Sequence, residues 1–167
     1  MYLNILFLPF LAAIISGLLG RLIGVKGVWL INILCLTLTT LFSFIAFYEV
    51  VLCNSPVSIE LFSWINIENF KVTWSFYFDS LTVSMLIPVL IVSTLVHIYS
   101  IGYMGEDPHV QRFFSYISLF TGLMIILVTG NNFLVMFVGL ISLGLFITNS
   151  YIINITMYWN LDNIIYY

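Results

Sequence analysis

The chain has 167 residues, of which 62% are hydrophobic and only 7% are charged, and its formal net charge is −3. Ordinary soluble domains carry about 25% charged residues, so this composition excludes a soluble domain and indicates an integral membrane protein. The four basic residues are too few for a nucleic-acid-binding surface. The lipid bilayer is therefore the first partner that the sequence predicts, and no nucleic acid is expected.

Two long apolar runs open the chain. A membrane-spanning helix needs roughly 20 apolar residues, which predicts a first span over residues 2–20 and a second over residues 28–51. The segment 21–27 between them holds Arg21 and Lys26. Short loops that carry Lys and Arg stay on the inner side of a membrane, so this loop is predicted inside and the N-terminus outside.

Residues 54–77 differ from the apolar runs, because they contain Asn, Glu, Lys and Trp. Apolar and polar positions alternate over residues 57–64 and again over residues 70–76, and alternation is typical of strands. A turn around residues 66–69 would pair the two strands as a hairpin. Its aromatic residues suit the membrane interface, so the hairpin is predicted on the outer membrane face.

Three more helices are predicted after the hairpin. The third span begins near Asp79, and Asp79 or Ser80 can cap its N-terminus through a side-chain oxygen. The span runs to about residue 101 or 103. A fourth span over residues 113–129 and a fifth over residues 133–147 follow, separated by a Gly-Asn-Asn turn. The Asn- and Tyr-rich tail, residues 148–167, is expected at the inner interface. The predicted fold class is an all-α integral membrane protein with about five transmembrane helices and a short outer hairpin between helices 2 and 3.

Ionisable side chains at membrane depth are costly, which makes them candidates for function. His97 lies in the third span toward its inner end, and histidine changes its protonation near neutral pH. It is either a proton relay or a neutral, hydrogen-bonded packing residue. Asp79 and Glu49 lie near the outer boundary, where they either line a proton exit or cap and solvate helix ends. These three residues are the candidates for a proton path.

The predicted inner loop, residues 105–112, holds Glu106, Asp107 and Arg112. Arg112 is a candidate ion-pair partner for either acid, and an exposed pair of this kind contributes about 0–1 kcal/mol. The sequence has no lysine within a predicted span, no mid-span carboxylate, no nucleotide-binding fingerprint and no metal-ligand spacing. It therefore predicts no catalytic residue, no bound cofactor and no metal site in this chain.

The most specific pattern lies between residues 76 and 139. Its motifs are Phe-Asp-Ser-Leu-Thr at 78–82, His-Ile-Tyr-Ser-Ile-Gly-Tyr-Met at 97–104, Asp-Pro at 107–108, Arg-Phe-Phe-Ser-Tyr at 112–116, Thr-Gly-Asn-Asn-Phe at 129–133 and Phe-Val-Gly at 137–139. Together they resemble the start of chain 5 of mitochondrial NADH–ubiquinone oxidoreductase, the antiporter-like subunit of respiratory complex I. The resemblance covers about residues 1–139.

This resemblance implies a multi-pass protein of the mitochondrial inner membrane whose partners are other membrane-arm subunits of complex I. It implies a role in proton translocation coupled to electron transfer from NADH to ubiquinone, as a subunit of the H⁺-translocating NADH:ubiquinone reductase. NADH, FMN, iron–sulfur clusters and ubiquinone are expected in other subunits of that complex. The isolated chain is predicted to be inactive.

The sequence departs from the family pattern after Gly139. The family continues Trp-Glu-Gly, whereas this chain continues Leu-Ile-Ser-Leu-Gly, so Ile141 stands where the family has a glutamate of its buried charged axis. The expected organisation is an N-terminal transmembrane region over residues 1–139 and a divergent tail over residues 140–167 that completes the fifth helix. The tail is interpreted as intron read-through, and a fragmented gene is the alternative.

Two other functions stay open from the sequence. One is a non-catalytic membrane module that packs against a partner chain, for which the small residues Gly139 and Gly144 are suited. The other is a monovalent cation/proton antiporter subunit, to which the same family is related.

Overall fold

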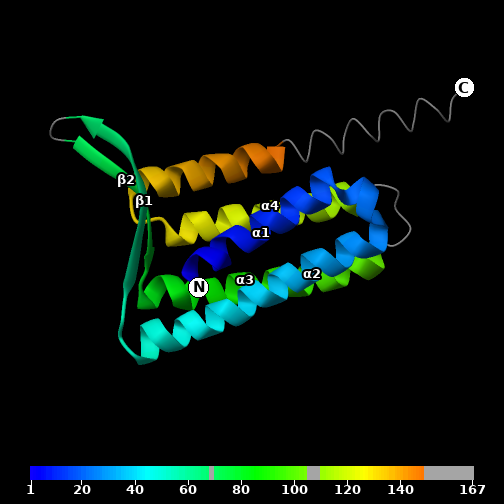
Figure 1. Ribbon diagram of the computed structural model, residues 1–167, viewed down its shortest axis with the longest axis horizontal. Coiled ribbons are helices and arrows are strands. Elements are labelled where there is room, and N and C mark those ends of the chain that lie inside the picture. Colours follow the sequence, from blue (N-terminus) through cyan, green and yellow to red (C-terminus); the bar gives the residue numbers. More distant parts are fainter. Residues whose placement is uncertain (68–69, 105–109, 149–167) are drawn as a thin grey trace, which may run out of the picture.

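The computed structural model describes residues 1–67, 70–104 and 110–148. Four helices lie side by side as a bundle, and a two-stranded hairpin crosses one end of it (Figure 1). The elements in chain order are α1 (Tyr2–Leu18), α2 (Gly20–Phe47), the π-helix η1 (Tyr48–Leu52), β1 (Val57–Ile67), β2 (Phe70–Phe78), α3 (Ser80–Tyr103) and α4 (Val110–Thr129). A further helix, Phe133–Thr148, runs beside α4.

Three helices in the described part of the chain are long and apolar enough to cross a membrane. They are Gly20–Leu52, Ser80–Tyr103 and Val110–Thr129, while Tyr2–Leu18 and Phe133–Thr148 are apolar but shorter. The structure therefore confirms a mostly helical chain with several apolar helices and one hairpin. The predicted helix at residues 113–129 begins earlier than expected, because α4 starts at Val110.

The loop predicted at residues 21–27 is wrong. Helix α1 ends at Leu18 and α2 begins at Gly20, so the segment that carries Arg21 and Lys26 is helical. Arg, Leu and Lys favour helix, and the chain departs from helical geometry within this segment at Gly24, with φ 80° and ψ 169°. Glycine adopts this conformation without the steric cost that a side chain would add. One glycine therefore bends the chain where a whole loop was expected.

The end of α2 also differs from a plain helix. It continues into η1, where the N–H of Cys53 donates to the carbonyl of Tyr48 at 3.2 Å. Asn54 follows with φ 53°, a left-handed conformation that asparagine tolerates better than most residues. This turn directs the chain out of the bundle and into the hairpin.

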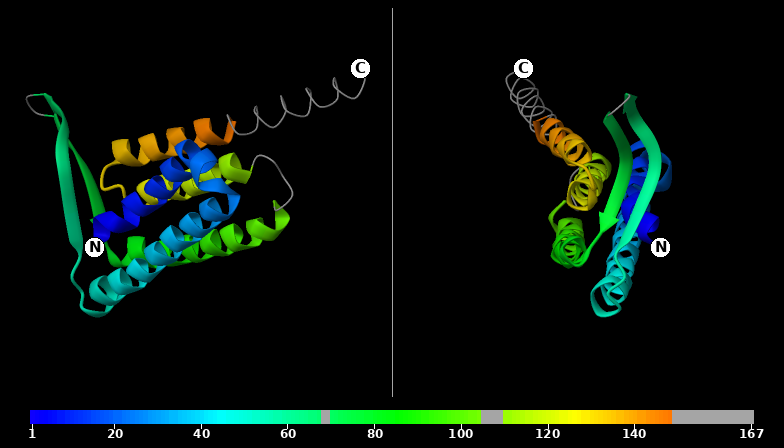
Figure 2. Two further views of the ribbon diagram at one scale, coloured as in Figure 1. Left: turned by 45° about the vertical axis from the view of Figure 1, so that its right-hand side comes forward. Right: turned by 90° about the vertical axis from the view of Figure 1, so that its left-hand side faces the viewer.

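The predicted hairpin is confirmed, and its strands are longer than the alternation indicated. β1 and β2 pair antiparallel, with Val57 opposite Phe78 and two register shifts along β1. The expected turn includes residues 68–69, which lie outside the described residues. Figure 2 shows from the side that the hairpin stands across the ends of the helices instead of running along them.

Two buried apolar clusters hold the bundle together. The larger one lies at the hairpin end, where Phe76 and Phe78 of β2 pack with side chains from α1, α3 and the helix after α4. A smaller cluster at the opposite end consists of Val28, Val110 and Phe114. The hairpin is therefore part of the core. The polar groups described below lie between the larger apolar cluster at the hairpin end and the smaller cluster at the opposite end.

Candidate functional site

Three polar side chains are fully buried where α2, α3 and α4 meet. Asn32 of α2, His97 of α3 and Ser118 of α4 are each 0% exposed. Buried polar groups are normally hydrogen-bonded, because an unpaired one loses its bonds to water without compensation. Their contacts therefore define the polar centre of this bundle, here called the polar network.

Both ring nitrogens of His97 lie within hydrogen-bond distance of a partner. Its Nδ1 lies 2.7 Å from the carbonyl oxygen of Ser93, one turn earlier on α3, and its Nε2 lies 3.1 Å from the hydroxyl of Ser118 on α4. The ring meets the edge of Phe114 with 6.0 Å between centroids. The histidine is thus held on three sides.

The network continues from α4 to α2. The hydroxyl of Ser118 donates to Oδ1 of Asn32 at 2.6 Å, and Nδ2 of Asn32 donates to the carbonyl oxygen of Val28 at 2.8 Å. Ser118 and Asn32 are 86 residues apart in the sequence. The histidine, the serine and the asparagine therefore tie three helices together through side chains alone.

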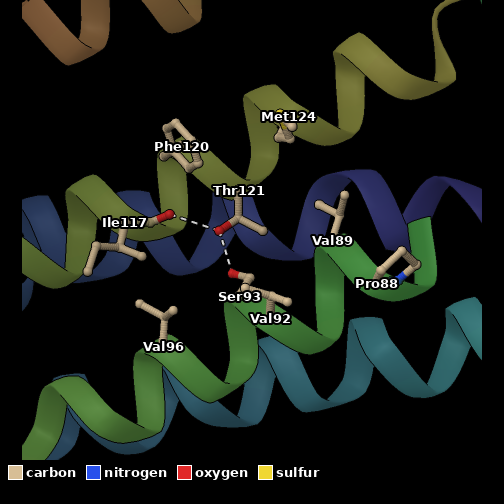
Figure 3. A pocket seen from close by; sticks show the side chains of 9 residues that line it. All are labelled: Pro88, Val89, Val92, Ser93, Val96, Ile117, Phe120, Thr121 and Met124. Carbon is tan, nitrogen blue, oxygen red and sulfur yellow. Dashed lines mark hydrogen bonds between the residues drawn. The ribbon is translucent and has the colours of Figure 1, made fainter. Parts of the chain in front are cut away.

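A groove lies between α3 and α4 (Figure 3), and it adjoins the network at Ser93, whose carbonyl oxygen contacts Nδ1 of His97. Its volume is about 410 Å³, and its lining residues are Pro88, Val89, Val92, Ser93, Val96, Ile117, Phe120, Thr121 and Met124. Thr121 donates its hydroxyl hydrogen to the carbonyl of Ile117 at 2.9 Å, so Ser93 must donate in the 2.7 Å contact between Ser93 and Thr121. Ser93 thus has contacts on two sides. Its hydroxyl lies at the groove, and its backbone carbonyl contacts the ring of His97.

The two acidic candidates lie at the hairpin end. Glu49, on η1, accepts a hydrogen bond from the hydroxyl of Tyr2 at 2.7 Å. Asp79 caps α3, because its side chain accepts from the N–H of Ser80 at 2.7 Å and its own N–H donates to Thr82 at 2.7 Å. The predicted N-cap is confirmed, and both acids have partners that hold a helix end.

The structure does not bring the three proton-path candidates into one cluster. Asp79 and His97 are separated by 18 residues of α3, roughly 27 Å of helix. Glu49 follows the end of α2 beside the hairpin. A proton path through all three residues would need further proton-carrying groups between them. The polar network supplies such groups only around His97.

The predicted ion pair falls mostly outside the described residues. Glu106 and Asp107 belong to the segment 105–109, while Arg112 lies in the first turn of α4. The described residues contain no group of three or more His, Cys, Asp or Glu that could hold a metal ion.

Several residues of the polar network and of the adjoining groove were missed by the sequence reasoning. Asn32, Ser93, Ser118 and Thr121 were not singled out, although Ser93 precedes His97 by one helical turn and Ser118 precedes Thr121 by about one turn. Such spacing places side chains on one face of a helix. Polar residues that recur with this period within an apolar span are the signal that indicates them.

The Gly-Asn-Asn turn also does more than reverse the chain. Asn131 bonds Ser75 twice, from its N–H to the carbonyl and from its side-chain amide to the hydroxyl, each at 3.1 Å. Asn132 donates from its side chain to the carbonyl of Thr73 at 2.8 Å. The turn therefore fastens the end of α4 and the start of the next helix to β2.

The fold and the polar network define a multi-pass helical membrane protein whose helices are joined by buried polar side chains. Comparison with known proteins shows what the chain is similar to. Residues 64–114 match the family model described as NADH-Ubiquinone oxidoreductase (complex I), chain 5 N-terminus. Over 144 residues, 86% of this chain, the sequence is 58% identical to NADH-ubiquinone oxidoreductase chain 5 of Hypocrea jecorina and 62% identical to that of Podospora anserina. The chain is thus similar in sequence to the N-terminal part of complex I chain 5 proteins.

The match covers 21% and 22% of those two relatives, so the chain spans about a fifth of their length. A third relative, "Probable intron-encoded endonuclease 4" of Neurospora crassa, is 58% identical over 144 residues, which are 86% of this chain and 26% of that protein. The family and the apolar helices together identify a multi-pass protein of the mitochondrial inner membrane, as the sequence indicated.

Proposed function

We propose that this chain is an N-terminal portion of a membrane-arm subunit of respiratory complex I. The proposed role is proton translocation coupled to electron transfer from NADH to ubiquinone, with other membrane-arm subunits as partners. The observation that carries the proposal is the identity of about 60% to chain 5 proteins over most of the chain. The apolar helices and the polar network fit a subunit whose chemistry takes place within a bilayer.

The proposed topology has five membrane spans. The three long helices cross the bilayer, and the shorter helices Tyr2–Leu18 and Phe133–Thr148 complete the bundle with an outer N-terminus. NADH, FMN, iron–sulfur clusters and ubiquinone bind in other subunits. His97 is the proposed proton-handling residue of this chain, and Glu49 and Asp79 belong to the outer end of its bundle.

The proposed association with complex I is tested on native gels of inner mitochondrial membranes. We expect an antibody against the hairpin segment 57–67 to detect a protein in the band that oxidises NADH. A second antibody, against the tail 149–167, distinguishes this chain from a longer subunit with the same N-terminus. Signal from the hairpin antibody only in fractions without NADH oxidation would contradict the proposal. The isolated chain, reconstituted in liposomes, is expected to show no saturable proton flux.

We further propose that residues 140–167 derive from intron read-through after a chain 5 exon. The similarity to a protein named as an intron-encoded endonuclease, over as many residues as the similarity to chain 5, supports this origin. Sequencing of mature messenger RNA should show transcripts in which the codon of Gly139 is joined to codons for Trp-Glu-Gly. Transcripts that always continue into Leu140 and Ile141, with no spliced form, would favour a fragmented gene instead.

A further inference from the structure

The polar network contains more hydrogen-bond contacts than a neutral histidine can complete. It runs from the carbonyl of Val28 through Asn32, Ser118 and His97 to the carbonyl of Ser93, and it has four contacts of 2.6–3.1 Å. Each contact needs one hydrogen. Both ends are carbonyl oxygens, which only accept. All four hydrogens must therefore come from the three side chains.

The supply of hydrogens is one short when the ring is neutral. Asn32 can place one hydrogen in the chain of contacts, because its amide nitrogen donates and its amide oxygen only accepts, and the hydroxyl of Ser118 supplies one more. A neutral imidazole adds one, whereas a protonated imidazole adds two. Three hydrogens serve four contacts in the neutral state, and four hydrogens serve four contacts in the protonated state.

Neither neutral tautomer of His97 removes the shortage. With the hydrogen on Nε2, the ring donates to Ser118 but Nδ1 faces the carbonyl of Ser93 at 2.7 Å, two acceptors in contact. With the hydrogen on Nδ1, the ring donates to Ser93 and accepts from Ser118. The oxygens of Ser118 and Asn32 then face each other at 2.6 Å without a hydrogen between them.

Turning the amide of Asn32 moves the mismatch without removing it. Its nitrogen would then donate to Ser118, and its oxygen would face the carbonyl of Val28 at 2.8 Å. The count of hydrogens is therefore independent of how the amide is oriented. Only a doubly protonated ring, with the amide as it stands in the structure, completes all four contacts.

We propose that His97, Ser118 and Asn32 form a proton-binding site within the bundle, which takes up and releases one proton at His97. This deepens the proposed proton-handling role of His97 at the same site. Burial of a charged ring opposes uptake, whereas the completed contacts favour it. The two opposing effects make the proton exchangeable, which is what a relay requires and a packing histidine does not.

Other titratable or charged side chains also lie on the three helices that carry the network. They are Arg21, Lys26 and Cys35 on α2, Tyr99 and Tyr103 on α3 with Asp79 at its N-cap, and Arg112 and Tyr116 on α4. None of them forms a hydrogen bond with the network in the described chain. Lys26 and Arg112 each precede the nearest network residue on their own helix by six positions, roughly 9 Å.

The test measures the protonation of His97 by nitrogen NMR on the full 167-residue chain in lipid nanodiscs. Histidine is labelled with ¹⁵N, and the His109→Gln variant identifies the signals of the chain's other histidine. We expect singly and doubly protonated forms of the His97 ring to coexist between about pH 5 and 8. A ring that stays singly protonated throughout this range would overturn the proposal.

Two variants alter the count of hydrogens. Asn32→Leu removes the acceptor for the Ser118 hydroxyl and leaves only the two contacts of the His97 ring. A neutral ring protonated on Nδ1 completes both of them. The ratio of doubly to singly protonated His97 should therefore fall about tenfold, the equivalent of one hydrogen bond to a charged group. Ser118→Ala removes the acceptor for Nε2 and should act in the same direction. Thr39→Val is the matched control, because buried Thr39 bonds the carbonyl of Leu36 on its own helix.

Unchanged ratios in both folded variants would overturn the proposal, and so would an equal fall in the Thr39→Val control. If neither variant folds, as judged by circular dichroism, the wild-type titration decides by itself. The measurement needs no assembly with other chains. A failed proton site and a failed association with complex I are therefore separate results.

Discussion

Replacing Phe76 with alanine is expected to lower the free energy of unfolding by about 3–5 kcal/mol, the usual cost of removing a buried phenylalanine ring. Phe76 is 1% exposed and belongs to the apolar cluster at the hairpin end. Its backbone also pairs with Gly130 in an isolated bridge. Loss of the ring would leave a cavity between β2 and the helices, and denaturant titration in detergent micelles, followed by tryptophan fluorescence, measures the change.

Phe62→Ala is the matched control on the other strand of the hairpin. Phe62 is 57% exposed, and its ring stacks on Trp74 with 6.0 Å between centroids. An exposed aromatic pair of this kind contributes about 1 kcal/mol, so the control should be several-fold milder than Phe76→Ala. Equal losses in the two variants would show that the hairpin does not dock on the bundle through β2.

The contrast between the two strands explains which parts of the fold the sequence could predict. Alternation identified the hairpin, and the long apolar runs with the cap at Asp79 identified α3. Neither pattern says which strand packs on a helix bundle. The bend at Gly24 was missed for a related reason, because one glycine can replace a loop when its neighbours favour helix.

The candidate site shows the same limit more clearly. His97 could be selected from the sequence because an ionisable residue within an apolar span is rare. Its partners are Ser, Asn and backbone carbonyls, which are common in membrane helices. What makes Asn32 and Ser118 special is their contact across 86 residues of sequence. That contact depends on how α2 and α4 pack, and no local pattern contains it.

Glycines set how closely the helices approach, and Gly139 provides the sharpest test of the packing after α4. A Cβ atom there would lie 3.2 Å from the backbone Cα and N of Leu127 in α4. Backbone atoms cannot turn aside as a flexible side chain can, so Gly139→Leu should push the Phe133–Thr148 helix away from α4. We expect a loss of about 1–3 kcal/mol in the free energy of unfolding, measured by the same denaturant titration.

Gly144→Leu is the matched control, since it adds the same side chain to the same helix at a position where a Cβ atom would meet nothing within 4 Å. Leucine favours helix over glycine by about 1 kcal/mol, so this variant should be neutral or slightly stabilised. The two substitutions share every local effect on the helix and differ in the contact with Leu127. A loss of stability in both would place the cost in the helix itself, whereas a loss in Gly139→Leu alone would show that this helix packs directly on α4 and that the chain continues the bundle beyond its fourth helix.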